Sequence, residues 1–459
     1  MKTRGLGVAL GTLLVSACAM GPDYQRPETT MPGAFEQTVD SSSSIANLNW
    51  WELFDDEQLN SLIRTALEQN RDMAIAVSRI EEARAALGFV RSDQYPQFEV
   101  SAGANRGNSI PGTAVIVPLS NNFVLAGNLS FELDLWGKLR RSTEAAQAEL
   151  LATVDAGNSI MITLISDVAS AYLLLLDLDN RVAIAERTLN TRNDSLAIIQ
   201  ARFDRGTVAL IDVNQAQIEM YDAQAQLAAL QRQDVQAENL LSVLLGQHPG
   251  AILRKRRDIY SLQPLQVPAG LPSELLQRRP DVRVAEQQLA AQTARIGVAE
   301  AIRFPSISLT GSLGLASDEL SGFFSGDNKT WSLGAGLFAP VFNAGRNKRR
   351  VEVEVARTEQ ALLNYEETVL QVLREVEDSL VAVHTFEDEI LARENQLKAA
   401  QSAAMLSRAR YDGGVTSYLE VLESERSQFR AELLASSTRR EQLVSYITLY
   451  KALGGGWTP

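Results

Sequence analysis

The sequence predicts an α+β membrane protein in which each chain contributes four β-strands to a barrel that very long helices continue. Three observations predict this fold class. The chain carries an internal two-fold sequence repeat, it contains two pairs of stretches in which apolar and polar residues alternate, and a long helical segment follows each pair. Alternation with a period of two over about ten residues is typical of strands that have one apolar and one wet face.

The first element, residues 1–17, is a targeting segment. A basic head, MKTRG, precedes an apolar run that is too short for a transmembrane helix, and small residues lead to Cys18. This pattern predicts a lipoprotein signal peptide, after which Cys18 is acylated and becomes the first mature residue. The alternative is an ordinary signal peptide with an incidental cysteine. The only cysteine of the chain lies where acylation needs it, and this favours the lipoprotein.

The residue after Cys18 is Ala19 rather than aspartate, which favours sorting to the outer membrane. We find no later stretch that is long and apolar enough to be a transmembrane helix. The sequence therefore predicts an exported, lipid-anchored chain without a helical span.

Two halves of the chain align with each other. Residues 69–103 align without gaps on 278–312, "DLWGKLRR" at 134–141 resembles "PVFNAGRNKRR" at 340–350, and "ARFDRGT" from 201 resembles "ARYDGGV" from 409. The register holds across several landmarks. We therefore predict two copies of one unit, which cover 57–250 and 273–453.

Each copy begins with a helix, expected over 57–94 and 273–303, that ends where proline disfavours helix in the preceding residue. A β-hairpin follows, over 97–135 and 304–342, with loops expected at 106–121 and 316–330. The apolar face of the four strands is formed by Phe98, Val100, Ala102, Ala104, Phe123, Leu125, Leu129, Phe131, Leu133, Leu135, Ile307, Leu309, Leu313, Leu315, Trp331, Leu333, Ala335 and Leu337.

Long helical segments over 138–203 and 344–411 come next, and they are poor in glycine and proline. At a rise of 1.5 Å per residue each is about 100 Å long. Glycine-containing tips at 203–207 and 411–416 then turn the chain back into a second helix. These helices lack a broad apolar face, which indicates that they pair with one another in tubes.

Four strands are too few for a closed barrel, since the smallest membrane barrels have about eight. An open sheet edge in hydrocarbon costs several kcal/mol for each unpaired backbone group. The pattern therefore requires several copies: a dimer would supply eight strands and a trimer twelve. The alternative is a soluble β-hairpin region packed on helices. The signal peptide and the polar second face favour the membrane.

Composition excludes other classes of protein. The formal charge of −13 argues against a nucleic-acid partner. The chain has two separated histidines, His248 and His384, one cysteine and no glycine-rich phosphate loop, so we expect neither an enzyme nor a metal site. We expect no cofactor, and the only attached group we expect is the lipid on Cys18.

With these residues identified, the chain resembles the outer-membrane factors of tripartite efflux systems, the TolC/OprM-like family with its NodT-type lipoproteins. The matching stretches run in order along the mature chain: "CAMGPDYQRP" (18–27), "FELDLWGKLR" (131–140), "LPSELLQRRPDV" (271–282), "FPSISLTGSLG" (304–314), "VTSYLEVLESERS" (415–427) and "YKALGGGW" (450–457).

The resemblance implies a homotrimer with a 12-stranded β-barrel in the outer membrane and an α-helical barrel across the periplasm. It implies an equatorial belt to which 18–56 and the linker 251–272 contribute, and leaves 454–459 as a C-terminal tail. The implied function is the exit duct of a tripartite efflux pump. The implied partners are a periplasmic adaptor (membrane fusion protein), an inner-membrane pump of the resistance-nodulation-division (RND) type, and outer-membrane lipid.

The resemblance also implies a periplasmic gate after the second tip. Glu420 and Glu423 occupy the places of two acidic residues that ring the family's constriction, and Leu419 matches an apolar residue that narrows it. Their spacing puts both glutamates on one helix face. Crowded carboxylates around one axis would raise one another's pKa and favour cations. The alternative is that both are solvated surface acids.

In the family a latch joins a tyrosine at the second tip to an aspartate after the first, and Tyr411 and Asp212 match these. The arginine that often completes the latch is absent, because its place is Thr416; Arg410 is an unaligned substitute. Gly206, Thr207, Gly414 and Val415 are implied adaptor contacts, with helix-ending turns as the alternative for both glycines. The remaining functional alternatives are the outer-membrane component of type I protein secretion and a periplasmic adaptor or scaffold lipoprotein.

Overall fold

The computed structural model describes residues 19–28, 31–32, 35, 49–109, 116–254, 257–263 and 274–455. The chain divides into two compact units, each made of three chain segments. We call them the sheet unit (Met1–Glu28, Arg79–Val154 and Val284–Glu366) and the helical unit (Thr29–Ser78, Asp155–Arg283 and Glu367–Pro459). Cys18, the predicted lipidation site, lies outside the described residues.

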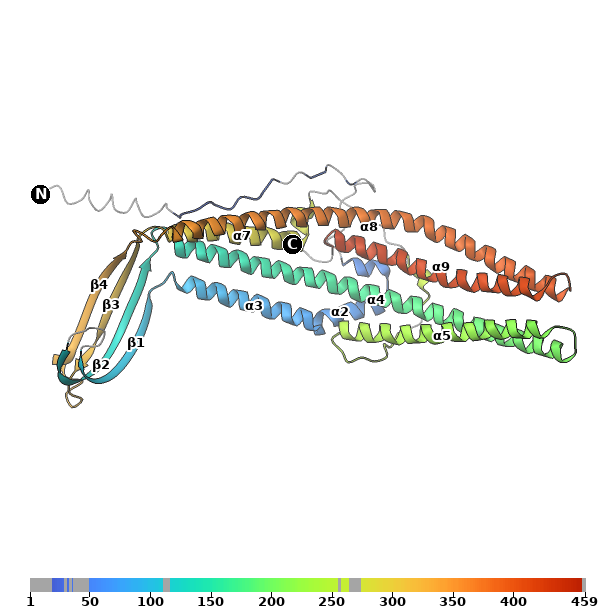
Figure 1. The fold of residues 1–459 in the computed structure, drawn as a ribbon, viewed down its shortest axis with the longest axis horizontal. Helices are drawn as coiled ribbons and strands as arrows, with labels where there is room; N and C mark the ends of the chain where they lie inside the picture. The colour runs from blue at the N-terminus through green and yellow to red at the C-terminus, as the bar shows by residue number, and fades with distance from the viewer. Residues whose placement is uncertain are drawn as a thin grey trace. The chain divides into compact units, whose positions relative to one another are not determined.

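The sheet unit contains one four-stranded antiparallel sheet (Figure 1). Its strands are β1 (Gln97–Ser109), β2 (Ile116–Leu133), β3 (Ser306–Ser317) and β4 (Lys329–Phe338). Their order in the sheet is β1-β2-β3-β4, so β1 and β4 form its two edges. The hairpins of the two repeats pair with each other through β2 and β3, and the sheet remains open.

The strand register confirms the predicted faces. Phe98 lies opposite Leu129, and Gly311 joins Leu129 to Leu333 in the same row. Trp331 lies opposite Leu313 in a neighbouring row. These apolar side chains are largely exposed in the single chain, with 69% for Phe98, 71% for Leu313 and 74% for Trp331. The sheet therefore presents an uncovered apolar face.

The first hairpin is longer than the sequence predicts. Residues 106–121 were expected to form a loop, but Arg106 pairs with Asn121 and Gly107 with Ser120. Apolar, polar and small residues are mixed in this stretch without clear alternation. Backbone pairing does not require alternation, so the sequence pattern does not reveal these strand ends. In the second hairpin β3 runs to Ser317 and the 3₁₀ turn η4 (Gly326–Asn328) leads into β4.

The helix predicted over 57–94 is two helices, and this expectation was wrong. α2 (Glu57–Gln69) ends at Asn70, and α3 (Arg71–Ser92) begins directly after it. Asn70 has extended backbone angles. Its Oδ1 accepts hydrogen bonds from the amides of Asp72 and Met73, and its Nδ2 donates to the carbonyl of Leu244. The side chain caps the second helix.

The single helix predicted over 273–303 was also wrong, because the chain is extended at Arg279 and forms a short helix before it and a longer one after it. Proline at 280 disfavours helix in the residue before it. The long helices agree closely with expectation. α4 (Lys138–Asp204) and α5 (Leu210–Leu244) form one helical hairpin, and α8 (Arg346–Asp412) and α9 (Tyr418–Ala452) form the other (Figure 1). Shorter elements are η1 (Trp50–Phe54), η2 (Ile259–Ser261), α6 (Leu275–Arg278) and α7 (Pro280–Ala301). α3, α4, α7 and α8 each contribute residues to both units.

The core of the helical unit joins segments that lie far apart in the sequence. The ring of Trp50 stacks on that of Tyr450, with centroids 5.6 Å apart. Tyr172 is fully buried and donates a hydrogen bond to Asp56 Oδ2 at 2.9 Å. Arg254, from the linker after α5, is bound by three carboxylates, those of Asp179, Asp234 and Glu238.

The expectation that no later stretch is long and apolar enough for a transmembrane helix was wrong for one helix. α4 contains an 18-residue window with a mean hydropathy of 1.9, long and apolar enough to cross a membrane. However, 61% of that window is buried within the fold. Burial of this extent is typical of the core helix of a folded domain, and the high hydropathy reflects core packing.

Candidate gate at the helical tips

The two helical tips have the same backbone geometry. Gly206 and Gly414 have φ values of +72° and +74°, a region that side chains other than glycine rarely adopt. The amide of Thr207 donates to the carbonyl of Arg202 at 3.0 Å, and that of Val415 donates to the carbonyl of Arg410 at 2.9 Å. Both glycines therefore act as helix-ending residues. Thr207 and Val415 are exposed beside them.

Asp212 and Glu420 occupy corresponding places in the two repeats but make different contacts. Asp212 Oδ2 accepts a hydrogen bond from the amide of Ala209 at 3.2 Å and so caps α5. Glu420 instead accepts a hydrogen bond from the hydroxyl of Thr416. Its Oε1 lies 3.5 Å from Nε of Arg410. Arg410 therefore pairs with one of the two candidate gate acids across the second tip.

Glu423 also has an arginine partner. Its Oε2 lies 2.9 Å from Nη1 of Arg426, one helical turn later on α9. Both side chains are mostly exposed, and an exposed pair of this kind contributes little stability. It does place a positive charge beside the acid. Arg426 was not among the expected gate residues, although the i, i+3 spacing in "ESER" signals its pair with Glu423.

Tyr411 packs between the two tips. Its ring centroid lies 5.3 Å from that of Tyr418, and the guanidinium of Arg202 lies 5.1 Å above it. Tyr418 belongs to a buried cluster with Ile199, Val213, Ala216, Val421 and Leu422. Among the hydrogen bonds of the described residues, none joins Tyr411 to Asp212. Leu419 is largely exposed next to this cluster.

Sequence reasoning missed an ion-pair cluster between α4, α5 and α9. The side chains of Arg192 and Glu219 are almost fully buried, with Nη2 3.2 Å from Oε2. Arg426 pairs with the other carboxylate oxygen of Glu219. Arg192 also lies 5.3 Å over the ring of Phe429. The cluster ties the first helical hairpin to the second, and its members are too far apart in sequence for any local pattern to reveal it.

Burial changes the titration of groups near the second tip. It raises the pKa of Tyr418 to about 12 and raises the pKa of Glu425, which Arg408 opposes. Arg408 Nη1 lies 3.4 Å from Glu425 Oε1 and donates to Ser195 at 3.2 Å. These contacts also join α8, α9 and α4.

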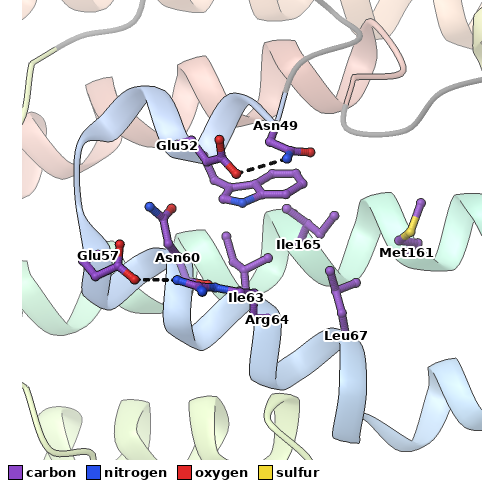
Figure 2. A pocket seen from close by; sticks show the side chains of 10 residues that line it. Asn49, Glu52, Glu57, Asn60, Ile63, Arg64, Leu67, Met161 and Ile165 are labelled. Carbon is purple, nitrogen blue, oxygen red and sulfur yellow. Dashed lines mark hydrogen bonds and ion pairs between the residues drawn. The ribbon is translucent and has the colours of Figure 1, made fainter.

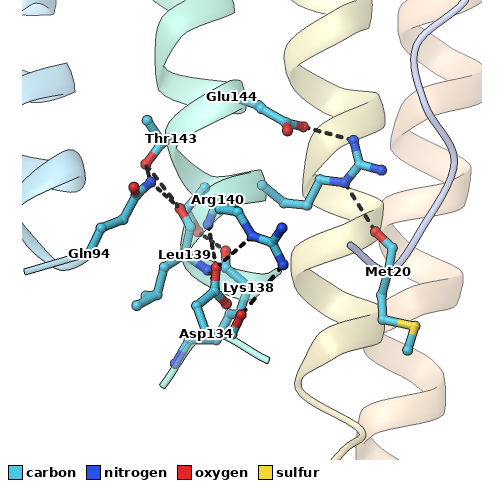
Figure 3. A network of polar contacts seen from close by, with 10 residues as sticks. Met20, Gln94, Asp134, Lys138, Leu139, Arg140, Thr143 and Glu144 are labelled. Carbon is cyan, nitrogen blue, oxygen red and sulfur yellow. Dashed lines mark hydrogen bonds and ion pairs between the residues drawn. The ribbon is translucent and has the colours of Figure 1, made fainter. Parts of the chain in front are cut away.

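The segment after Cys18 is bound to the sheet unit. The amide of Met20 donates to the carbonyl of Trp136 at 3.0 Å. Arg141, with only 6% of its surface exposed, donates to the carbonyls of Met20 and Gly21 and pairs with Asp23 and Glu144. Two of these partners, Met20 and Glu144, are labelled in Figure 3. Gly21 and Gly297 allow close contact, because a Cβ on Gly21 would lie 2.5 Å from Gly297 Cα.

A hollow of about 650 Å³ opens in the helical unit beside α2. Ile63, Leu67 and Ile165 provide apolar lining, and Arg64 and Glu57 pair at its edge (Figure 2). None of the candidate gate residues is among the residues that line this hollow. Within the part of the chain that the structure describes, no group of three or more histidine, cysteine, aspartate or glutamate residues could hold a metal ion.

Comparisons with known proteins agree with this architecture. The family model described as "Outer membrane efflux protein" matches twice, over residues 62–247 and 271–455. Each match falls largely within one of the two predicted repeats.

The curated relatives include the cation efflux system protein CusC of Escherichia coli strain K12, which is 34% identical over 97% of both chains. The toluene efflux pump outer membrane protein TtgI of Pseudomonas putida is 34% identical over all of this chain and 99% of the relative. The probable outer membrane lipoprotein SilC of Salmonella typhimurium is 31% identical over 99% of both.

Among solved structures, the open state of the MtrE outer membrane channel of Neisseria gonorrhoeae superposes with a TM-score of 0.86 at 31% identity. The superposition covers 96% of this chain and 98% of that one.

Proposed function

Since the chain belongs to the outer membrane efflux protein family and is an outer-membrane efflux channel, we propose that three copies form the exit duct of a tripartite pump. Each copy supplies four strands to a closed 12-stranded barrel. The helical hairpins of the three copies form a tunnel that continues the barrel into the periplasm.

The open sheet is the observation that carries this proposal. β1 and β4 have one paired side each, and the apolar face is exposed from Phe98 to Trp331. In hydrocarbon each unpaired backbone group would cost several kcal/mol. Neighbouring copies can pair β4 with β1 and so remove both edges, which leaves the apolar face toward lipid and the polar face toward a water-filled lumen.

The exposed tips support docking of an adaptor. Gly206, Thr207, Gly414 and Val415 lie on the turns of the two helical hairpins, and both glycines have open space around them. We assign these turns to contact with a periplasmic adaptor. An inner-membrane pump of the RND type would supply the energy, because passive conduction needs none from the duct.

The gate is proposed at Leu419, Glu420 and Glu423. Three copies would bring these side chains around one axis, each acid accompanied by its arginine, Arg410 or Arg426. In this chain the arginines would temper the cation preference of the glutamates. Asp212 and Tyr411 remain the proposed latch. In this structure Asp212 caps α5, and Tyr411 contacts the first hairpin through Arg202.

We further propose that Cys18 carries the N-terminal lipid. The printed name of SilC, an outer membrane lipoprotein, supports this, as does the binding of residues 20–23 to the sheet unit. The relatives' names mention a cation and toluene. We propose that the duct conducts small toxic compounds that the pump selects.

Planar-bilayer conductance of the purified protein, combined with its mass in detergent, tests the proposal. We expect a trimer that forms ion-conducting channels. Glu420→Ala with Glu423→Ala should lower the ratio of cation to anion permeability, because it removes two negative charges per copy and takes one carboxylate partner from each of Arg410 and Arg426; Glu441→Ala, an exposed acid far along α9, serves as the matched control. A monomer without conductance would contradict the channel, and an unchanged permeability ratio would remove both glutamates from the gate.

A further inference from the structure

A run of basic residues follows the second strand of each β-hairpin. The first run already has a role, because its Arg141 holds the segment after Cys18. The second run has none so far. In the first repeat the run is Lys138, Arg140 and Arg141. In the second repeat it is Arg346, Lys348, Arg349 and Arg350. Both runs belong to the sheet unit, so their surroundings can be compared directly.

The first run is neutralised within the chain. Lys138 Nζ lies 2.6 Å from Glu132 Oε1, and Arg140 binds Asp134 through both its amide and its guanidinium (Figure 3). Arg141 is buried and holds the segment after Cys18. Each of the three cations therefore has a carboxylate of this chain as its partner.

The second run faces solvent. The side chains of Lys348 and Arg349 are 74% and 77% exposed, and both lie near the single carboxylate of Glu352, at 3.8 and 2.6 Å. Arg346 and Arg350 are exposed and make no ion pair with any described residue of the chain. Four cations thus share one acid, in a chain whose overall charge is −13.

These charges lie where a helix favours the opposite sign. α8 begins at Arg346, so all four cations fall in its first five residues. The N-terminal end of a helix carries a partial positive charge, and cations there are unfavourable. The four positive charges therefore destabilise the start of α8. A bound anion would offset this repulsion, and since the chain supplies only one nearby carboxylate, the anion would come from outside the chain.

The residues before the run indicate which anion. β4 carries Trp331, Leu333 and Leu337 on the apolar face, and Val341 and Phe342 follow with exposures of 95% and 89%. Along the chain the order is apolar strand, aromatic residue and basic run. A bilayer presents the same order from its hydrocarbon to its phosphate groups.

We propose that Arg346, Lys348, Arg349 and Arg350 form a binding site for the headgroups of anionic phospholipids in the periplasmic leaflet of the outer membrane. The proposal rests on the barrel placement of β4 given above. Guanidinium groups bind phosphate oxygens in a two-point geometry, and three of the four residues are arginines. We favour lipid over the adaptor as the partner, because the tip assigned to adaptor contact follows the C-terminal end of the 67-residue helix α8 and the basic run lies at its N-terminal end.

Full-length protein reconstituted in lipid nanodiscs tests this site. The probe is a fluorescent phosphatidylglycerol, with phosphatidylcholine as the neutral comparison. We expect wild type to bind phosphatidylglycerol at least about tenfold more tightly at low salt, since each basic residue near an anionic surface adds attraction. Raising the salt concentration should abolish the difference.

Replacing all four residues by glutamine should remove the preference, while Arg346→Lys with Arg349→Lys and Arg350→Lys should keep most of it. The matched control, Arg357→Gln with Arg374→Gln, Arg393→Gln and Lys398→Gln, removes four charges farther along α8 and should leave the preference unchanged. Equal binding of both lipids by wild type, or a preference that survives in the glutamine variant, would overturn the proposal. So would full competition by inorganic phosphate, which would indicate a site for free anions.

Conductance separates this inference from the function it rests on. A channel that conducts normally but shows no lipid preference would refute only the headgroup site. If the wild-type protein neither conducts ions nor forms trimers, the proposed duct itself is refuted, and the headgroup site is refuted with it.

Discussion

Arg141 shows how one residue can position a chain segment. Its guanidinium contacts two backbone carbonyls and two carboxylates, and the side chain is nearly inaccessible to water. A buried cation is stable only when its donors are satisfied. Here both carbonyls and one of the carboxylates belong to the stretch directly after Cys18, so the residue determines where the proposed lipid anchor leaves the fold.

We predict that Arg141→Ala releases this stretch. Loss of charged hydrogen bonds worth about 1.5–3 kcal/mol each should increase hydrogen exchange at the Met20 amide by about tenfold or more. Arg141→Lys should have an intermediate effect, because an ammonium group cannot make the same forked contacts. Arg140→Ala is the control, since the Arg140 side chain is 43% exposed. Equal exchange in the two alanine variants would contradict the positioning role of Arg141.

Asp177 is a second residue whose environment decides its chemistry. It is fully buried, accepts a hydrogen bond from Ser436 at 2.6 Å, and lies 3.5 Å from Arg181 and 3.7 Å from Arg440. Burial raises its pKa in spite of these partners. The folded state therefore retains a proton at a pH where the unfolded state has lost it.

The sign of the pH dependence follows from linkage. As pH rises from the ordinary aspartate pKa through the raised folded value, the folded state loses stability relative to the unfolded state. We predict that the thermal midpoint of wild type, measured relative to Asp177→Asn, falls across this window. Asp194→Asn, an exposed position on the same helix, should show no such trend. A wild-type midpoint that rises relative to Asp177→Asn would contradict the assignment.

At the scale of elements, the end of α5 packs against the end of α2 without room for a side chain. Gly246 has a φ of +71°, and a Cβ added there would lie 2.1 Å from the Gln69 carbonyl oxygen. Gly206 has nearly the same φ, +72°, but open space around it. Comparing substitutions at Gly206 and Gly246 therefore distinguishes the cost of backbone strain from the cost of steric contact.

We predict that both alanine substitutions destabilise the protein, by about 1–2 kcal/mol for the left-handed backbone alone. Gly246→Ala should cost about 1–3 kcal/mol more, because overpacking forces the two helix ends apart. Thermal loss of the helical circular dichroism signal measures both. If Gly206→Ala proves as damaging as Gly246→Ala, the contact with Gln69 is not the cause.

Elements with a strong period could be predicted from the sequence, and those that depend on one side chain could not. The alternation in "NFVLAGNLSFELDL" identifies the β2 face directly, and the long helices follow from their composition. The break between α2 and α3 at Asn70 could not be predicted, because asparagine can also occur within a helix. Only the folded structure shows that its side chain caps α3. The buried pair of Arg192 and Glu219 escapes because it joins different helices.

For the candidate gate, the positions of the tips could be predicted from the sequence, but the contacts of the individual side chains could not. The repeat locates both tips and aligns Asp212 with Glu420, and the glycines indicate the turns. The different use of the two acids depends on Thr416 and Arg410, which come close only when the tip folds. Tertiary contacts of single side chains leave no periodic signal.

For the whole molecule, the faces of the sheet decide where the chain resides. Leu333 and Ser332 are neighbours on β4 with opposite orientations, since Leu333 lies opposite Gly311 and Ser332 opposite Ser312. If three copies close a barrel, Leu333 faces lipid and Ser332 faces the lumen. A lysine on the lipid face of a membrane barrel costs about 2–4 kcal/mol near the bilayer midplane.

We therefore predict that Leu333→Lys sharply reduces the yield of inserted, detergent-resistant trimer, which is measured as the fraction that migrates as an oligomer in unheated gels. Ser332→Lys should insert normally and lower the cation preference of single channels, because it adds three positive charges to the lumen of a trimer. Both variants add the same charge to the same strand, so only the orientation of the side chain distinguishes them. Equal trimer yields would mean that the exposed apolar face does not meet lipid, and the sheet would then require a protein partner to cover it.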